Sequence, residues 1–286
     1  MEIDFLFLFF ISLHIILWGD GFINFKIGDY VSRISHNHDV TFKIIGFMSN
    51  KVLLQGVHVR LSADADISDL VLVNGNQLSY TEDEEIIQRN IKDINMDRDN
   101  YFYIPGKILH IDGDNDYLER CMNFYKSMGI QANGITIRED LIAEKIHSLI
   151  EEYRPDIVVI TGHDAYYSKK NNMKDIHNYQ NSIYFSKAIK EARKYEKNQD
   201  KLIIIAGACQ SDYEELIQSG ANFASSPKRI NIHALDPAIV AVSLAFSDKN
   251  QSIDLIQLIQ KTKYGSDGMG GIITNGTMYV GYPRWI

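Results

Sequence analysis

Residues Leu202–Ser211 read LIIIAGACQS and give the strongest indication of the architecture. An unbroken apolar run leads into small residues and then into Cys209. Such a run is typical of a short strand buried on both faces of a parallel sheet. The stretch Ile157–Asp164, IVVITGHD, repeats the pattern and ends in His163. The two stretches therefore predict neighbouring strands whose reactive residues lie at their carboxyl ends.

Further apolar runs on either side alternate with helical patterns. Strands are expected at 108–111, 134–137, 157–160, 202–205 and 222–224, and helices at 116–128, 141–153, 183–197, 212–219 and 237–246. This alternation predicts an α/β domain over residues 105–286, with a doubly wound, mostly parallel sheet. In that architecture ligands bind beyond the carboxyl ends of the strands.

The residues before this domain have a different pattern. Residues 25–80 read as short strands with turn signals and predict a small SH3-like β-barrel, and residues 81–104 read as an acidic linker that is partly helical. Residues 1–24 contain FLFLFFISLHIILW, too short for a comfortable bilayer span and without a basic start. It is interpreted as an extension from a misplaced start codon, a weak membrane anchor or a buried helix. A membrane partner is not expected.

Charge and cysteine content narrow the class of protein. The 286 residues carry 29 Lys and Arg against 37 Asp and Glu, a formal net charge of −8, which argues against a non-specific nucleic-acid binder. The two cysteines, Cys121 and Cys209, cannot form a disulfide framework. Reduced thiols are therefore expected.

Cys209 and His163 are the candidate catalytic residues. A thiol is a strong nucleophile only as thiolate, which a nearby histidine or the amino end of a following helix stabilises. Backbone amides at Gly162 and Gln210 are the candidate oxyanion hole. Cys121, in the middle of a predicted helix, is expected in the core.

Other polar residues are weaker candidates. Asp112 and Asp114 follow the first strand, where carboxylates can bind metal, accept phosphate, grip a basic substrate group or cap the next helix. His233 is a second candidate histidine and His110 is expected in the core. The pair in His36-Asn37-His38 lacks a second ligand cluster, so neither a metal nor a cofactor is expected.

Three segments carry a family resemblance: Gly162-His163-Asp164, Ala206–Ser211 (AGACQS) and Ala224–Pro237 (ASSPKRINIHALDP). Together they resemble the YabG family of sporulation-specific proteases, over about Phe25 to Arg284. The resemblance implies a protease that processes spore coat and cortex-related proteins, with cleavage after Arg or Lys. It also implies spore coat and morphogenetic proteins as partners and a location in the mother-cell cytoplasm or spore coat, while the net negative charge predicts no nucleic-acid partner.

A more distant similarity concerns mechanism. An apolar block before His163 and another before Cys209 are similar to caspase-, gingipain- and clostripain-type cysteine proteases. Those enzymes usually read His-Gly where this chain reads Gly162-His163, and they usually carry a specificity residue where this chain has Gly207. This similarity implies that the loop after the first strand grips the substrate. Asp112 or Asp114 would then line an acidic S1 pocket.

Two alternatives from other classes remain open. Asp112, Asp114 and Lys228 resemble the acidic and basic residues of a receiver-like module that handles metal or phosphate. His163-Asp164 and Ala208-Cys209 stand where that fold expects other residues, so this alternative fits less well. The other is a structural spore-coat protein that docks through its barrel and has a decayed site.

Overall fold

The computed structural model describes residues 25–48, 51–73, 81–93, 100–167, 173 and 175–284. The predicted extension over residues 1–24 lies outside the described residues, as do residues 74–80 of the predicted barrel and 94–99 of the predicted linker.

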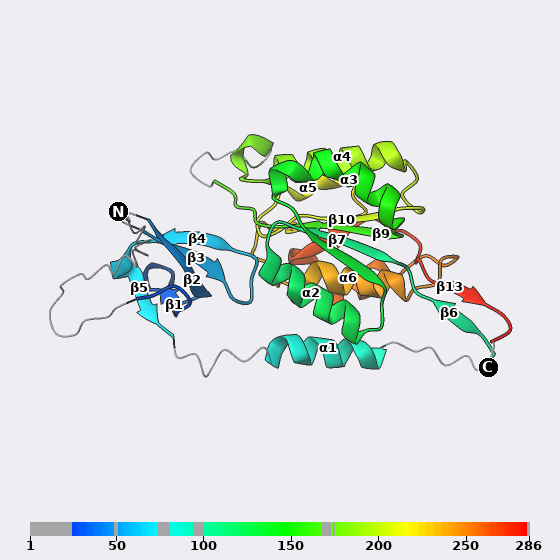
Figure 1. The fold of residues 1–286 in the computed structure, drawn as a ribbon, viewed down its shortest axis with the longest axis horizontal. Coiled ribbons are helices and arrows are strands. Elements are labelled where there is room, and N and C mark those ends of the chain that lie inside the picture. The colour runs from blue at the N-terminus through cyan, green and yellow to red at the C-terminus, as the bar shows by residue number, and fades with distance from the viewer. Residues whose placement is uncertain are drawn as a thin grey trace, which may run out of the picture.

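The N-terminal part is a five-stranded antiparallel sheet (Figure 1). Its strands are β1 (Tyr30–Arg33), β2 (Thr41–Met48), β3 (Lys51–Gly56), β4 (Ser62–Ala65) and β5 (Leu70–Leu72), in the order β4-β3-β2-β1-β5. Val31, Phe42, Ile44 and Val52 are fully buried, as expected for strands with one face toward a core. The antiparallel sheet is observed, whereas its closure into an SH3-like barrel stays a prediction.

The α/β domain is built on a six-stranded sheet. Its order is β12-β11-β10-β9-β7-β8, and β12 alone runs antiparallel to its neighbour. The strands are β7 (Ile108–Asp112), β8 (Ala132–Thr136), β9 (Ile157–Thr161), β10 (Ile203–Ala206), β11 (Phe223–Ser225) and β12 (Met269–Gly271). The mostly parallel sheet is confirmed, because β7–β8, β7–β9, β9–β10 and β10–β11 all pair in parallel. Every residue of β7, β9, β10 and β11 is buried, as their apolar runs predict.

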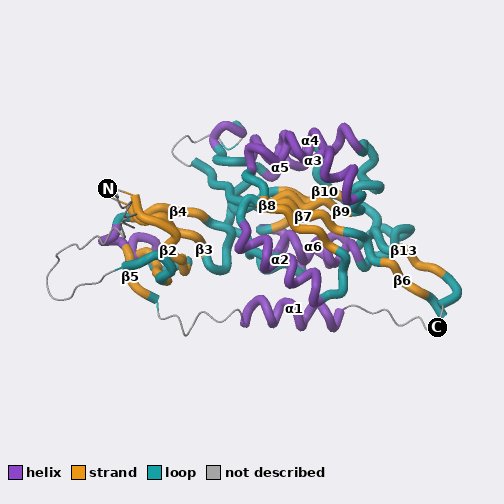
Figure 2. Tube along the Cα trace, in the orientation of Figure 1, coloured by secondary structure: helices purple, strands orange, loops and turns teal. Residues whose placement is uncertain are grey.

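Helices cover both faces of this sheet (Figures 1 and 2). One face carries α3 (Glu139–Tyr153), α4 (Ser182–Tyr195) and α5 (Tyr213–Gln218), and the other carries α2 (Asn115–Ser127) and α6 (Asp236–Ala245). Buried residues form one hydrophobic cluster on each face. The cluster under α2 and α6 continues into the N-terminal sheet, so that sheet and the α/β domain share a core.

The remaining elements are short or peripheral. Helix α1 (Thr81–Asp93) lies beside α2, α7 (Leu255–Gln260) precedes β12, and β6 (Phe102–Ile104) pairs with β13 (Tyr279–Gly281). Among the described residues, none of the helices has the length and apolar character needed to cross a bilayer.

Candidate active site

The candidate catalytic residues follow strands at the carboxyl edge of the parallel sheet, and the strand order reverses between two of these strands, β7 and β9. From β7 the chain proceeds outward to β8, and the next strand, β9, lies on the other side of β7. Such a switch point is where open α/β sheets bind ligands. Asp114 follows β7, His163 follows β9 and Cys209 follows β10. The fold therefore brings three predicted site residues to one edge.

His163 is held by Asp114. The Asp114 carboxylate lies 2.9 Å from Nε2 of the His163 ring, and it also caps α2 by accepting from the amides of Asp116 and Tyr117. Burial by itself would raise the pKa of Asp114, but the bond to His163 and its charge outweigh burial and hold that pKa below the ordinary value. The carboxylate is thus suited to stabilise an imidazolium.

The other ring nitrogen of His163 is available. Nδ1 is buried, and among the described residues it has no hydrogen-bond partner. A histidine with one nitrogen fixed by a carboxylate and the other unpaired is arranged to exchange a proton with a nucleophile or a leaving group. The ring is only partly buried, with 17% of the side chain exposed, and it packs edge-on against Tyr117.

Cys209 is positioned by a buried polar network around Asp164. Ser211 donates to the Asp164 carboxylate and accepts from the amide of Ala208, so residues on both sides of Cys209 are fixed. Ser182, at the start of α4, donates to the same carboxylate. Burial raises the pKa of Asp164 despite these bonds. Asp164, which follows His163 in sequence, therefore orders the Cys209 loop.

The thiol itself is covered. Cys209 is fully buried, and its Sγ lies 3.3 Å from the amide nitrogen of Ile232, which donates to it. Burial raises the pKa of Cys209 to about 12, although the Ile232 bond and the Arg60 charge act in the opposite direction. In this arrangement the thiol is neutral, and its cover includes Ile232, at the end of the segment 226–232, and the backbone of Arg60.

The amides predicted to form an oxyanion hole lie beside Cys209 and His163, but they are enclosed. The amide of Gln210 donates to the Ile230 carbonyl at 3.0 Å and to Ser226 Oγ at 3.1 Å. Gly162 lies against the carboxylate of Glu139, which accepts from the His163 amide at 2.9 Å. An added Cβ at Gly162 would come within 2.4 Å of Glu139 Oε1, so a larger residue there would displace the Glu139 carboxylate.

Asp112 makes contacts that the sequence did not indicate. Its side chain is fully buried and pairs with Arg60 Nη1 at 2.5 Å, while Thr161 donates to the same oxygen. Burial alone would raise the pKa of Asp112, but the charge of Arg60 and the bond to His110 hold it well below the ordinary value. The Asp112 carboxylate is therefore paired inside the protein and is not accessible to a substrate side chain in this structure. Its role in an S1 pocket stays a prediction.

Three further histidines differ in their surroundings. His110 is buried and bonded to Tyr125 and Thr161, in line with a core residue. His233 lies beside His58 and Glu82, away from the His163–Asp114 pair. Burial lowers the pKa of His58 and lowers that of His233 to about 4, so both rings are neutral.

Sequence reasoning missed Glu139, Arg60 and the pairing of Asp114 with His163. Glu139 stands just before the helix predicted at 141–153, and nothing in its own pattern shows that it inserts between Gly113 and Gly162. Arg60 lies in the connection between β3 and β4 of the N-terminal sheet, yet it reaches Asp112 and also donates to the Ala234 carbonyl. Only the strand order and the docking of the two parts bring these groups together.

Comparisons with known proteins identify the family to which the chain belongs. The family model described as YabG peptidase U57 matches residues 26–283. The chain is 39% identical over 286 residues to the sporulation-specific protease YabG of Bacillus subtilis (strain 168), an alignment that covers 91% of this chain and 99% of that protein. The chain belongs to the YabG peptidase U57 family.

Proposed function

We propose that this chain is a sporulation protease of the cysteine type, in which Cys209 is the nucleophile and His163 is the general acid and base. The similar protein from Bacillus subtilis is a sporulation-specific protease, and membership of a peptidase family implies protein substrates. We further propose spore coat and cortex-related proteins as substrates, cleavage after Arg or Lys, and action in the mother-cell cytoplasm or spore coat.

The mechanism rests mainly on the hydrogen bonding of the two nitrogens of the His163 ring. Asp114 holds Nε2, and Nδ1 is buried without a partner among the described residues. In the proposed reaction Nδ1 takes the thiol proton, and Sγ bonds to the scissile carbonyl carbon. As the C–N bond breaks, the proton passes to the leaving amine. Water then attacks the thioester, with His163 again as base, and releases the acid and the thiol.

The mechanism requires the cover over Cys209 to move. A neutral thiol with a pKa of about 12 is a poor nucleophile, and the amide of Gln210 is engaged by Ile230 and Ser226. We propose that this arrangement is a closed form, and that substrate binding displaces the segment 226–232. Displacement exposes Sγ to His163 and frees the Gln210 amide for the oxyanion. Positive φ angles at Gln210, Ser226 and Arg229 are consistent with a strained closed loop.

The receiver-like alternative is less well supported. A phosphate- or metal-handling site at the strand ends needs free carboxylates, and here Asp112 pairs with Arg60 while Asp114 pairs with His163. The alternative of a purely structural coat protein does not explain why Asp114 and His163 pair at the switch point, with Cys209 at the end of the neighbouring strand β10.

The proposal is tested with purified full-length chain and fluorogenic peptides carrying Arg, Lys or a neutral residue at P1. Cys209→Ala and His163→Ala are expected to abolish hydrolysis, while Cys121→Ala, the matched change at the other buried cysteine, keeps it. Undiminished hydrolysis by Cys209→Ala contradicts the thiol mechanism.

A second experiment tests the biological role. Sporulating cells that carry Cys209→Ala in place of the wild-type chain are expected to accumulate unprocessed coat proteins, seen by gel electrophoresis of spore extracts. A normal coat pattern in those cells contradicts the proposed substrates.

A further inference from the structure

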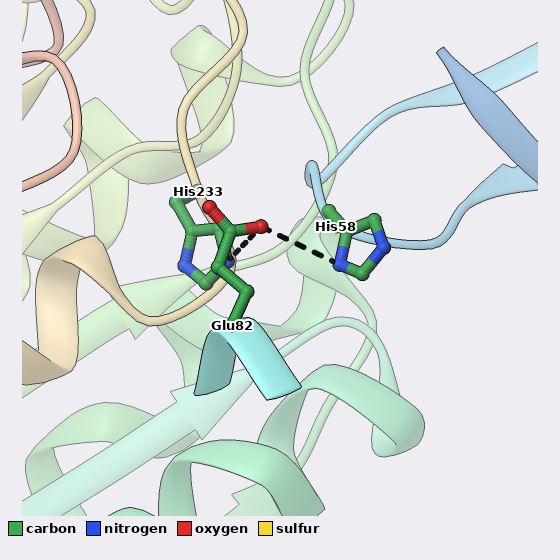
Figure 3. Close-up of side chains that lie close together, drawn as sticks. All are labelled: His58, Glu82 and His233. Carbon is green, nitrogen blue, oxygen red and sulfur yellow. Dashed lines mark ion pairs between the residues drawn. The ribbon is translucent and has the colours of Figure 1, made fainter. Parts of the chain in front are cut away.

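A second cluster of chemically active side chains lies outside the candidate active site. His58 comes from the turn after β3, Glu82 from the first turn of α1 and His233 from the loop before α6. Their ligand atoms all lie within 4.8 Å of one another. Figure 3 shows the Glu82 carboxylate between the two imidazole rings, with one oxygen directed toward both.

Two nitrogens in this cluster are buried without hydrogen bonds. Nδ1 of His58 and Nε2 of His233 have no hydrogen-bond partner among the described residues. Each lies 3.8 Å from Oε2 of Glu82, too far for a hydrogen bond, although the charges attract if the rings are protonated. His233 is fully buried, so its Nε2 cannot be satisfied by bulk water. Among the described residues, these two buried nitrogens therefore lack a hydrogen-bonding or coordinating partner.

Backbone contacts place His58 and His233 beside each other before any ligand binds. Val59 and His233 form an antiparallel bridge, and the amide of Ala234 donates to the His58 carbonyl at 3.1 Å. The N-terminal sheet and the α/β domain thus hold the two histidines side by side. The third residue, Glu82, is oriented by Lys263, which pairs with Oε1 and leaves Oε2 directed at the histidines.

We propose that His58, Glu82 and His233 bind one Zn²⁺ ion. Two imidazole nitrogens and one carboxylate oxygen form a donor set that zinc prefers, whereas Mg²⁺ and Ca²⁺ favour oxygen ligands alone. Ligand atoms of tetrahedral zinc lie about 3.4 Å apart, so the two 3.8 Å distances to Glu82 and the separation of the two histidine nitrogens, which is within 4.8 Å, shorten through side-chain rotations when the ion binds. Water, or Asp83, whose Oδ1 is 3.5 Å from His233 Nε2, completes the shell.

Two features oppose zinc binding, and we expect both to cost less free energy than coordination by three side chains provides. The amide of Leu235 donates to Nδ1 of His233 at 3.2 Å, and zinc at Nε2 moves the ring proton to Nδ1, so this long bond is lost. Lys263 and Arg120 add positive charge, but each is already paired with a carboxylate, Glu82 and Asp83 respectively. The local charge is therefore close to balanced, and coordination by three side chains decides the outcome.

A zinc ion bound here would link three parts of the chain. The N-terminal sheet, α1 and the α/β domain each contribute one ligand, so zinc adds a link at the junction that Arg60 and Asp112 already join. This role does not involve Cys209 or His163, so zinc binding and the protease mechanism can be tested independently.

The test uses the full chain with Cys209→Ala, so that hydrolysis plays no part. After dialysis against a chelator, the chain is titrated with ZnCl₂ against a fluorescent zinc indicator, and the melting temperature is measured with and without zinc. One equivalent is expected to bind and to raise the melting temperature. MgCl₂ in the same titration is expected to have no effect.

Variants then locate the ion. His58→Gln and Glu82→Gln, both at partly exposed side chains, are each expected to weaken zinc binding about tenfold or more and to remove the thermal shift. His36→Gln, in the exposed His36-Asn37-His38 turn, is the matched control and is expected to bind like the parent chain. Circular dichroism checks that each variant is folded. Failure of the parent to bind zinc, or undiminished binding by both ligand variants, overturns the proposal.

Discussion

At the scale of single residues, the two strand-end carboxylates have separate surroundings although they are two positions apart. Asp112, the last residue of β7, is buried against Arg60, whereas Asp114 caps α2 and reaches His163. The sequence identified both as site candidates, but it could not show that one pairs with an arginine and the other with a histidine. That division depends on β7 lying beside β9 and on Arg60 entering from the N-terminal sheet.

Asp114→Asn tests whether Asp114 positions His163. Asparagine is an equally good helix cap, so stability is expected to change little, while loss of the charge beside Nε2 lowers kcat by about 10²- to 10⁴-fold. The drop is expected for every P1 residue. Asp116→Asn, in the same helical turn, is the control. A loss confined to Arg and Lys peptides contradicts the positioning role and favours the predicted S1 pocket.

The raised pKa of Cys209 predicts how the rate of thiol modification changes with pH. A thiol whose pKa is raised from 9.0 to about 12 holds its proton more tightly, so about 10³-fold less thiolate is present at pH 7. In a Cys121→Ala background, iodoacetamide is expected to modify the folded chain at least that much more slowly than the urea-unfolded chain. The folded rate should rise about tenfold per pH unit from 7 to 9 without levelling near 9.

A substrate-like peptide is expected to accelerate the modification, because it displaces the cover over the thiol. Levelling of the folded-state rate near neutral pH contradicts the closed form and indicates a thiolate already paired with His163.

At the scale of elements, the buried parallel strands were predictable and the peripheral strands were not. The apolar runs at 108–111, 157–160 and 202–205 match β7, β9 and β10 within about a residue, because complete burial demands uninterrupted apolar residues. By contrast, β6 and β13 are three residues long, and their partners lie far apart in the sequence. Short strands of this kind depend on tertiary pairing, and local patterns do not indicate it.

Gly207 allows β10 to turn into the Cys209 loop. Its φ of +105° disfavours other residues, and an added Cβ would lie 2.9 Å from Leu216 Cδ1 in α5. Gly207→Ala is expected to reduce the free energy of unfolding by about 2–4 kcal/mol, the sum of backbone strain and overpacking. Gly28→Ala is the matched control, because φ is +95° there and a Cβ meets nothing within 4 Å. Equal losses in urea unfolding contradict the packing contribution.

At the scale of the whole molecule, the N-terminal sheet is part of the same folded unit as the α/β domain. Arg60 is fully buried, pairs with Asp112 and donates to Ala234, while Tyr117 of α2 donates to the carbonyl of Val59. These contacts join the sheet to the strand end that precedes Asp114. The sequence predicted two modules but could not predict this junction, because a lone buried arginine has no periodic signature.

Arg60→Met leaves the Asp112 carboxylate buried without its countercharge. It is expected to reduce the free energy of unfolding by about 3–5 kcal/mol, and Arg60→Met with Asp112→Asn is expected to recover part of that loss. Arg138→Met removes an exposed ion pair with Asp140, which solvent screens, and is expected to change the free energy of unfolding little. Urea titration of all three variants measures these values. A loss for Arg60→Met no larger than for Arg138→Met would show that the buried pair contributes little.

The bond from Arg60 to Ala234 spans 174 positions of the chain. A nascent polypeptide emerges from the ribosome with its N-terminal end first, so Arg60 is synthesised long before its acceptor exists. Until Ala234 and Ile232 follow, neither the junction nor the cover over Cys209 can form. Prematurely terminated chains that end before this segment therefore lack the finished fold, and they are expected to be substrates for cellular quality control instead of active proteases.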